Sequence, residues 1–347
     1  MRQIKRANRG VTASGYGLIV GLISVLALGV ITTTGSSVSG LFDTTATTLG
    51  GVIEEEGGQA GASPSATPAS SPGFNFSSHE FRSCGATGRT GPSLSDCQGF
   101  YSTSWHGDTN NFNVTGGIQY FTVPHDGTYR ILATGAQGGS SCGGRGVQVQ
   151  ADFILTRGDV LKILVGQPGR SHNNNSSGGG GGSFVATSTD VPLIVAGGGA
   201  GGMNCPANGG DDAVYTENSS QGLNYGIALG GRLYNRGDLN SGHGCAGSGF
   251  SGDGEQGGCS TGSKSFENGG TGANGGYEDG GFGGGGAYHN SGSNVGGGGG
   301  GYTGGHGHHG YDTHPAGGGG SYVDGGATNR VNVGFNSGEG RVLISLQ

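Results

Sequence analysis

Charged residues are scarce in this sequence, and aromatic residues are scarcer still. Charged side chains make up 11% and aromatic side chains 7% of the 347 residues, with a single tryptophan. Such a chain cannot build a large aliphatic core for its length, so backbone hydrogen bonds must carry more of the fold than usual. The net charge is −7, and no basic patch follows the cationic first ten residues. This acidic body argues against nucleic-acid binding.

Signatures of common catalytic sites are also missing. The chain has no phosphate-binding lysine motif and no H-E-x-x-H zinc motif. A G-x-G-x-x-G pattern occurs at Gly197, Gly199 and Gly202, but Pro206 follows it and no helix is predicted there. A dinucleotide site needs that helix. We therefore expect no enzymatic activity and no cofactor.

Glycine, in contrast, is in large excess, with 87 residues against an average share of about 7%. Between residues 178 and 320, short glycine runs are broken by single aromatic or small residues without a Gly-X-Y period, which excludes collagen. We predict a bundle of extended, threefold polyglycine II helices, because backbones without Cβ atoms can approach closely and exchange hydrogen bonds. Ordering glycine is entropically costly, so an adjoining sheet and disulfides must hold the bundle.

Alternating apolar residues predict strands in the rest of the C-terminal part. The pattern repeats every two residues around turns rich in glycine and aspartate, which is typical of a half-buried antiparallel sheet. We expect a small β-sandwich into which the C-terminal strand folds back. The strand-rich parts are 74–177, 191–196 and 329–347.

Six cysteines all follow the first 80 residues, namely Cys84, Cys97, Cys142, Cys205, Cys245 and Cys259. An even number of cysteines in an exported chain with a small core suggests disulfides. Six cysteines allow 15 connectivities. Proximity favours Cys84–Cys97 and Cys245–Cys259, which leaves Cys142–Cys205; reduced, buried thiols are the alternative.

The one long apolar run lies near the start, from Tyr16 to Ile31, behind a basic flank. Its 16 residues fall between a secretory signal and a membrane-spanning helix of about 20 residues. Residues 10–49 closely resemble Flp-type (type IVb, Tad) pilins, through Val11-Thr12-Ala13, Tyr16-Gly17-Leu18-Ile19 and Ser39-Gly40-Leu41-Phe42.

The pilin resemblance implies a leader, residues 1–10, that a prepilin peptidase removes between Gly10 and Val11. The apolar helix, 11–49, would then anchor the subunit in the inner membrane and later pack against other pilin subunits. These pilins carry a glutamate at the fifth mature position, where this chain has Gly15. In the family, this glutamate pairs with the positively charged N-terminus of a neighbouring subunit. A subunit without the acid cannot neutralise the N-terminus of a neighbour above it, which fits a subunit at the filament tip. Sequence drift in a rare subunit is the alternative. Residues 50–73 predict a flexible linker rich in Gly, Ala, Ser and Pro.

A second resemblance covers residues 74–347. The motifs "CGATGRTGPSLSDC", "GIQYFTVPHDGTYRILATGAQGG", "LKILVGQPG" and "PLIVAGGGAGG" follow one another in order. They resemble the glycine-rich domain of the anaplastic lymphoma kinase family of receptors and related bacterial and phage polyglycine adhesins. The resemblance implies a TNF-like antiparallel β-sandwich joined to a polyglycine II bundle, with a role in binding.

Aromatic and polar residues in expected loops are candidates for ligand binding, because rigid rings offer contact area at low entropic cost. They are Trp105, His106, Tyr288, His289, Asn290, Tyr302, His309 and Tyr311. For Trp105, packing under a disulfide-closed loop is an equal alternative. The histidines His306, His308, His309 and His314 are weak candidates for a metal site, and a solvated loop is the favoured interpretation.

These observations predict a minor type IVb-like pilin that carries a glycine-rich adhesin domain to the pilus tip, outside a bacterial cell. An unknown surface glycan or protein is the expected ligand. The alternatives are a structural pilin repeated along the shaft and a membrane-anchored binding protein that never polymerises.

Overall fold

The computed structural model describes residues 73–347 except 174–175, 208, 221–228, 232–243, 277, 289–294 and 309–314. All of them belong to one compact unit, Ser70–Gln347. The predicted leader, apolar helix and nearly all of the linker lie outside the described residues. Within the described residues, no helix has the length and apolar character needed to cross a membrane.

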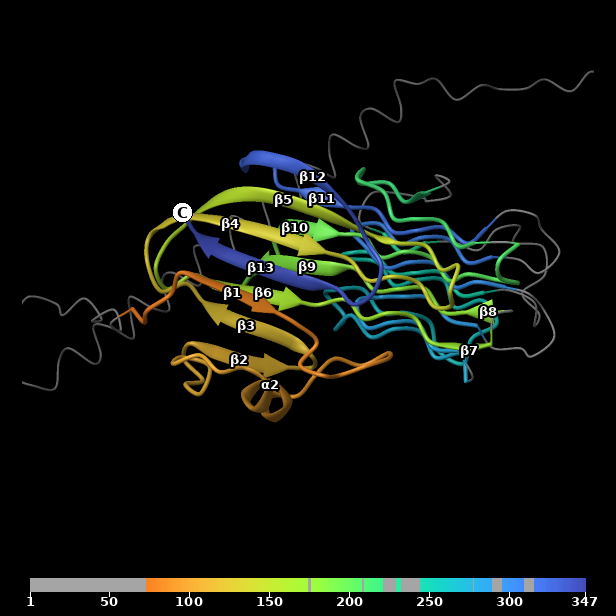
Figure 1. Cartoon of the computed structure of the whole chain (residues 1–347), viewed down its shortest axis with the longest axis horizontal. Helices are drawn as coiled ribbons and strands as arrows, with labels where there is room; N and C mark the ends of the chain where they lie inside the picture. The colour runs from red at the N-terminus through yellow and green to blue at the C-terminus, as the bar shows by residue number, and fades with distance from the viewer. Residues whose placement is uncertain are drawn as a thin grey trace, which may run out of the picture. The chain divides into compact units, whose positions relative to one another are not determined.

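The described unit is built mainly from antiparallel β-strands in two large sheets (Figure 1). Sheet A has the order β1-β13-β4-β5-β12, and sheet B has the order β11-β10-β9-β6-β3-β2. The strands of sheet A are β1 (Ser78–Phe81), β4 (Gly127–Thr134), β5 (Gly146–Leu155), β12 (Thr328–Asn336) and β13 (Arg341–Leu346). Those of sheet B are β2 (Phe112–Thr115), β3 (Ile118–Thr122), β6 (Val160–Leu164), β9 (Ser183–Thr187), β10 (Pro192–Ala196) and β11 (Tyr322–Val323). A short hairpin, β7 (Ser171–Asn173) with β8 (Ser176–Ser177), and the helix α2 (Leu94–Phe100) complete the elements.

The predicted antiparallel sheets and the return of the C-terminal strand are confirmed, since β13 lies inside sheet A between β1 and β4. The predicted boundaries need one correction. Strand β9 falls inside the range 178–320 that was predicted to be polyglycine. Phe184 and Val185 alternate between two apolar environments there, so the stretch after the glycine run pairs as a strand of sheet B.

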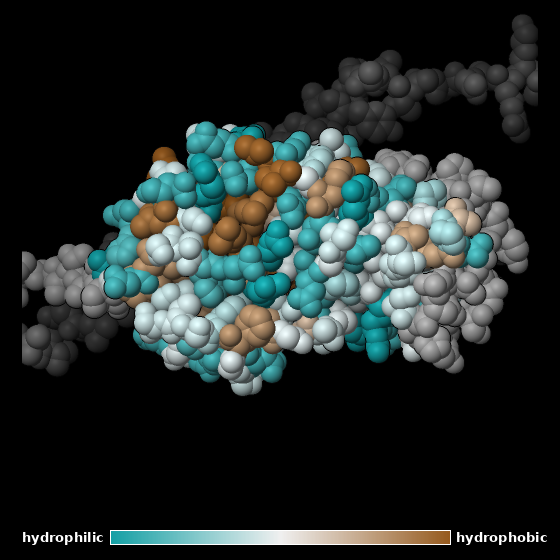
Figure 2. Space-filling model, viewed as in Figure 1, coloured by the Kyte–Doolittle hydropathy of each residue, from teal (hydrophilic) through white to brown (hydrophobic). Residues whose placement is uncertain are grey.

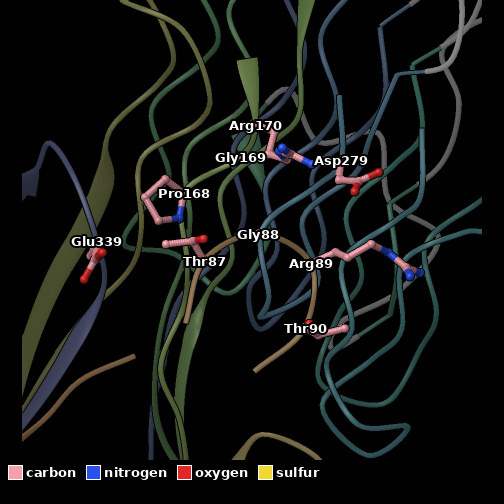
Figure 3. Close-up of a pocket in the computed structure, with 9 residues that line it drawn as sticks. All are labelled: Thr87, Gly88, Arg89, Thr90, Pro168, Gly169, Arg170, Asp279 and Glu339. Carbon is pink, nitrogen blue, oxygen red and sulfur yellow. The ribbon is translucent and has the colours of Figure 1, made fainter. Parts of the chain in front are cut away.

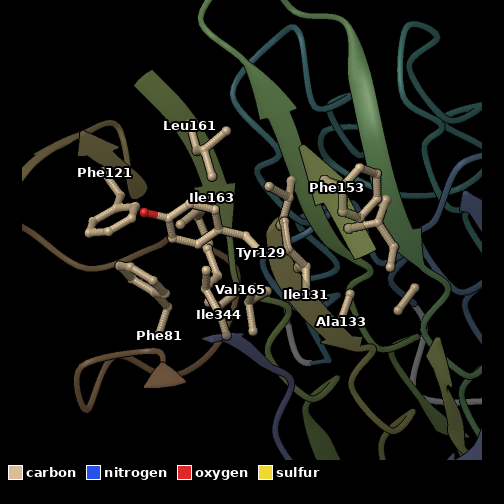
Figure 4. Packing of buried hydrophobic residues seen from close by; sticks show 14 of the residues in the cluster. Phe81, Phe121, Tyr129, Ile131, Ala133, Phe153, Leu161, Ile163, Val165 and Ile344 are labelled. Atoms are coloured by element: carbon tan, nitrogen blue, oxygen red, sulfur yellow. The ribbon is translucent and has the colours of Figure 1, made fainter. Parts of the chain in front are cut away.

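The main core fills the space between the two sheets. Alternate residues of β4 and β13 point inward, so that Tyr129, Ile131 and Ile344 are fully buried. Figure 4 shows Tyr129 extending toward Phe121 of sheet B. The Tyr129 hydroxyl donates to the carbonyl of His125 at 2.9 Å, which satisfies its polar end. The strands therefore alternate as expected for a sandwich.

Sheet B is buried on its second face as well. Phe184 and Val195 on this face pack with Phe250, Phe266 and Phe282 from the glycine-rich part of the chain. Phe184 stacks on Phe266 with ring centroids 5.3 Å apart. The single phenylalanines that interrupt the glycine runs thus pack the glycine-rich segments against the sandwich.

The glycine-rich segments run on from the ends of the strands and lie beside one another beyond the sandwich (Figure 1). We call them the glycine array, which comprises 135–146, 166–170, 177–183, 196–207, 209–213, 244–276, 279–288, 295–308 and 315–321. Along residues 297–302, six successive N–H groups donate in turn to three different segments and then to the same three again, at 2.8–3.2 Å. The acceptors are Ser177 and Gly180, Cys245 and Ser248, and Gly317 and Gly320. Each neighbour therefore receives a hydrogen bond every third residue, which satisfies buried backbone groups without a sheet.

An aromatic cluster surrounds His79 on β1. Its ring lies edge-on to Tyr101 at 4.5 Å and to Trp105 at 4.9 Å between centroids. The buried Nε2 atom has no hydrogen-bond partner among the described residues. Burial is the main cause that lowers the pKa of His79 from 6.5 to about 4, and the charge of His106 adds to it.

Acidification should therefore weaken the fold. The folded chain keeps His79 neutral, while the unfolded chain takes up a proton below pH 6.5. The stabilisation is fully present above pH 6.5 and is lost as the pH falls toward 4, by up to about 3 kcal/mol. Urea unfolding at pH 7.5 and pH 4.5 measures the loss. In His79→Phe, the fall in the free energy of unfolding between the two pH values should be smaller by about 3 kcal/mol. An equal fall in both proteins would contradict the role of His79 in the pH dependence.

Candidate functional site

A polar pocket of about 500 Å³ opens where the sandwich meets the glycine array. That volume lies within the range of small-molecule sites, roughly 300–1,000 Å³. Its lining residues come from four separate parts of the chain (Figure 3): Thr87, Gly88, Arg89, Thr90, Pro168, Gly169, Arg170, Asp279 and Glu339. Residues 87–90 form a loop after β1, 168–170 follow β6, Asp279 belongs to the array and Glu339 precedes β13.

Arg170 has a fixed backbone and a free side chain. Its N–H donates to the carbonyl of Asp279 at 2.9 Å, and its carbonyl accepts from Gly178 at 3.0 Å. The residue is exposed, and its guanidinium has no hydrogen bond or ion pair with any described residue. The array thus fixes the backbone of Arg170, while the N–H donors of its guanidinium stay available.

The loop 87–90 is docked onto the array by hydrogen bonds. Arg89 donates from Nε to the carbonyl of Gly272 at 3.3 Å and from Nη2 to Thr261 Oγ1 at 3.2 Å. The buried side chain of Gln167 donates from Nε2 to the carbonyl of Thr90 at 3.2 Å. The hydroxyls of Thr87 and Thr90 have no partner among the described residues. The loop is therefore held by its backbone and by Arg89, and it presents two free hydroxyls.

The two carboxylates of the pocket are partly engaged. Asp279 Oδ1 accepts from the N–H of Gly275 at 3.0 Å, and Glu339 Oε2 accepts from the hydroxyl of Ser83 at 3.2 Å. Figure 3 shows Arg89, Arg170 and Asp279 at one end of the pocket and Glu339 at the other. One end therefore carries two positive charges and one negative charge, and the opposite end carries a single negative charge.

The chain shares part of its sequence with a known protein. The leukocyte tyrosine kinase receptor of the mouse (Mus musculus) is 38% identical over 96 residues. The similarity is to a receptor. The match covers 26% of this chain and 11% of the receptor, so the chain spans about a tenth of the length of this relative. It supports the likeness of the glycine-rich part to the anaplastic lymphoma kinase family of receptors. No family model matches the chain, and the resemblance to Flp-type pilins stays a prediction.

This relative corrects one expectation. The chain was expected not to be an enzyme, and the relative that it matches is named as a tyrosine kinase. The expectation is contradicted on that finding. The matched residues make up 11% of the receptor, so the similarity does not extend the receptor's kinase activity to this chain.

The predicted ligand residues do not line the pocket. Trp105 is 4% exposed and stacks on Phe74 at 5.2 Å in the core, where rings from β1, β2 and β3 surround it. Tyr288 is 3% exposed. Neither ring is open to a surface ligand.

His106 is half-buried and its Nδ1 lies 2.7 Å from the carbonyl of Thr103. Tyr302 stacks on Tyr322 at 4.4 Å and is only partly covered. The candidates His289, Asn290, His309 and Tyr311 lie outside the described residues.

Two of the four histidine candidates for a metal site lie among the described residues. His306 and His308 are buried, and His306 Nε2 lies 3.0 Å from the carbonyl of Pro315. His309 and His314 lie outside the described residues. No group of three His, Cys, Asp or Glu side chains that could hold a metal ion occurs in the part of the chain that the structure describes.

Three disulfides join the cysteines as Cys84–Cys97, Cys142–Cys205 and Cys245–Cys259. The first and third are the pairs that proximity along the chain favours, and the second is the pair that they leave over. Disulfides persist in oxidising compartments, so the three bonds indicate an extracellular location.

A second surface of different character lies at the edge of sheet A. Val331, Val333 and Phe335 on the edge strand β12 are 47%, 45% and 42% exposed. Figure 2 shows apolar side chains gathered on the side of the molecule where β12 lies. The Arg145 guanidinium lies 4.5 Å from the centre of the Phe335 ring. This apolar edge and the polar pocket suit chemically different partners.

Sequence reasoning did not find Arg89, Arg170 and Asp279. Arg89 and Arg170 are single charged residues in glycine-rich or turn-rich stretches of a chain with few charges, and Asp279 follows Glu278 in such a stretch. The scarcity of charge around them is the one signal in the sequence that singles them out. The glycine array brings them together, and no local pattern indicates their proximity.

Proposed function

We propose that the chain is a minor type IVb-like pilin that carries its glycine-rich domain, residues 74–347, to the tip of a pilus and attaches it to a surface ligand. The observation that carries the binding role is the pocket in which the fixed backbone of Arg170 presents an unpaired guanidinium. A free, preorganised charge in a concave site favours a ligand, because little ordering remains to be done on binding.

The architecture supports this role. Binding residues in proteins commonly sit on loops that a rigid scaffold positions. Here the loop 87–90 is fixed by hydrogen bonds to the glycine array, and residues 168–170 are fixed by hydrogen bonds within it. We further propose that the sandwich is of the TNF-like type and that the array consists of polyglycine II helices. The hydrogen bonds that recur every third residue along 297–302 support the second point.

The proposed position at the tip rests on the N-terminal sequence. Cleavage between Gly10 and Val11 would leave the apolar helix on the mature subunit, anchored in the inner membrane before assembly. Gly15 replaces the glutamate with which the pilins of this type neutralise the neighbouring subunit. An unneutralised buried ammonium costs several kcal/mol, so a subunit with Gly15 suits a place with no neighbour above it.

Electron microscopy of sheared filaments with a gold-labelled antibody against residues 74–347 tests this proposal. The three possible architectures put the label in different places: at filament ends for a tip adhesin, along the shaft for a structural pilin, and on cell envelopes for an anchored protein that does not polymerise.

A further inference from the structure

The pocket has free hydrogen-bonding groups of both kinds. Arg170 offers its whole guanidinium, and Thr87 and Thr90 offer hydroxyls that can donate or accept. The carboxylates of Asp279 and Glu339 each have one oxygen engaged, by Gly275 and Ser83. A ligand that satisfies this set must bring acceptors to the arginine end and donors to the two carboxylates.

A negatively charged group on the ligand suits the arginine end. Arg89 is held there by Gly272 and Thr261, and Arg170 is unpaired, so the end has one positive charge more than Asp279 balances. A guanidinium binds a carboxylate through two parallel hydrogen bonds, which are stronger than bonds between neutral groups. A neutral ligand would leave this charge unmatched.

Hydroxyl groups suit the rest of the pocket. A polyanionic peptide would place further negative charge against Asp279 and Glu339, which is unfavourable. A saccharide instead supplies O–H donors to these carboxylates and accepts from the two threonines. The Pro168 ring, between the two ends in Figure 3, offers an apolar face for ring C–H groups.

We infer that the pocket binds a saccharide that carries a carboxylate, with the carboxylate on Arg170 and the sugar hydroxyls toward Thr87, Thr90 and Glu339. This inference rests on the proposed binding function and adds the chemical class of the ligand.

Calorimetric titration of the full chain, purified in detergent, tests this with four probes: 3′-sialyllactose, trigalacturonic acid, neutral lactose and a hexaglutamate peptide. We expect one or both acidic saccharides to bind and lactose and the peptide not to bind. In Arg170→Ala, loss of a charge-assisted pair should weaken the binding about tenfold to a hundredfold. Arg170→Lys should recover part of it, because the charge remains and the two-pronged geometry is lost.

The matched control is Arg330→Ala, which removes the same charge from β12. The Arg330 guanidinium donates to the carbonyls of Ala327 and Gly325, away from the pocket residues. Its affinity for the acidic saccharide should equal that of the wild type.

Four results overturn the inference: equal binding of lactose, binding of the peptide alone, no binding of any probe, or saccharide binding that Arg170→Ala leaves unchanged. The label on filaments does not depend on these probes. Label at filament ends with a failed titration would reject the ligand class and leave the proposed function standing. Label along the shaft would reject the proposed tip position without changing the titration.

Discussion

Replacing Gly300 with alanine should lower the free energy of unfolding by about 3 kcal/mol. The N–H of Gly300 donates to Gly180 at 2.9 Å, and its carbonyl accepts from Gly198 at 2.8 Å. A Cβ atom at this position would overlap the backbone carbonyl of Gly283. That carbonyl cannot turn away freely, since it accepts from the N–H of Gly182 at 2.9 Å. The added methyl group must therefore break or stretch hydrogen bonds between several segments of the glycine array.

Thermal unfolding followed by circular dichroism measures this effect, which should appear as a fall in Tm of about 5–10 °C. The control is Gly325→Ala, because no atom lies within 4 Å of a Cβ at Gly325. That variant should stay within about 0.5 kcal/mol of the wild type. Equal stability of the two variants would show that the backbones of the array are not packed as closely as the structure has them.

Removing the disulfide Cys142–Cys205 by the double change to serine should cost about 4 kcal/mol. The two cysteines are 63 residues apart, and a longer closed loop restricts the unfolded chain more strongly. The bond also joins two neighbouring parts of the array, where Gly210 donates to the carbonyl of Cys142 at 3.0 Å.

Urea unfolding without reducing agent measures this cost against the double serine variant of Cys84–Cys97. That pair is 13 residues apart, so its removal should cost less, about 3 kcal/mol. The reverse order of the two losses would show that local packing, and not loop length, determines what each disulfide contributes.

Local patterns in the sequence predicted much of the sandwich. The alternation of Tyr129 and Ile131 with polar neighbours determines which face of β4 is buried, and the same applies to β13. Strand β9 was missed because its apolar residues are buried on both faces, so that Phe184 and Val185 show no polar alternation. The glycine runs predicted a bundle of backbones, since glycine permits close approach, but they do not specify which segments become neighbours.

The pocket could not be predicted, for a physical reason. Arg89, Arg170 and Asp279 are brought together by backbone hydrogen bonds of the array, and backbone groups have no sequence signature. For Trp105, the sequence left two interpretations open. A lone tryptophan beside polar residues suits either a binding surface or a core, and the rings around His79 place it in the core.

Immunogold electron microscopy of sheared filaments, together with mass spectrometry of the mature N-terminus, tests the central claim most directly. We expect label from the antibody against residues 74–347 at filament ends only, and Val11 as the first residue. Regular label along the shaft would contradict the tip position. Label confined to cell envelopes, with Met1 or a residue beyond Ile31 as the first, would contradict the claim that this chain is a pilin.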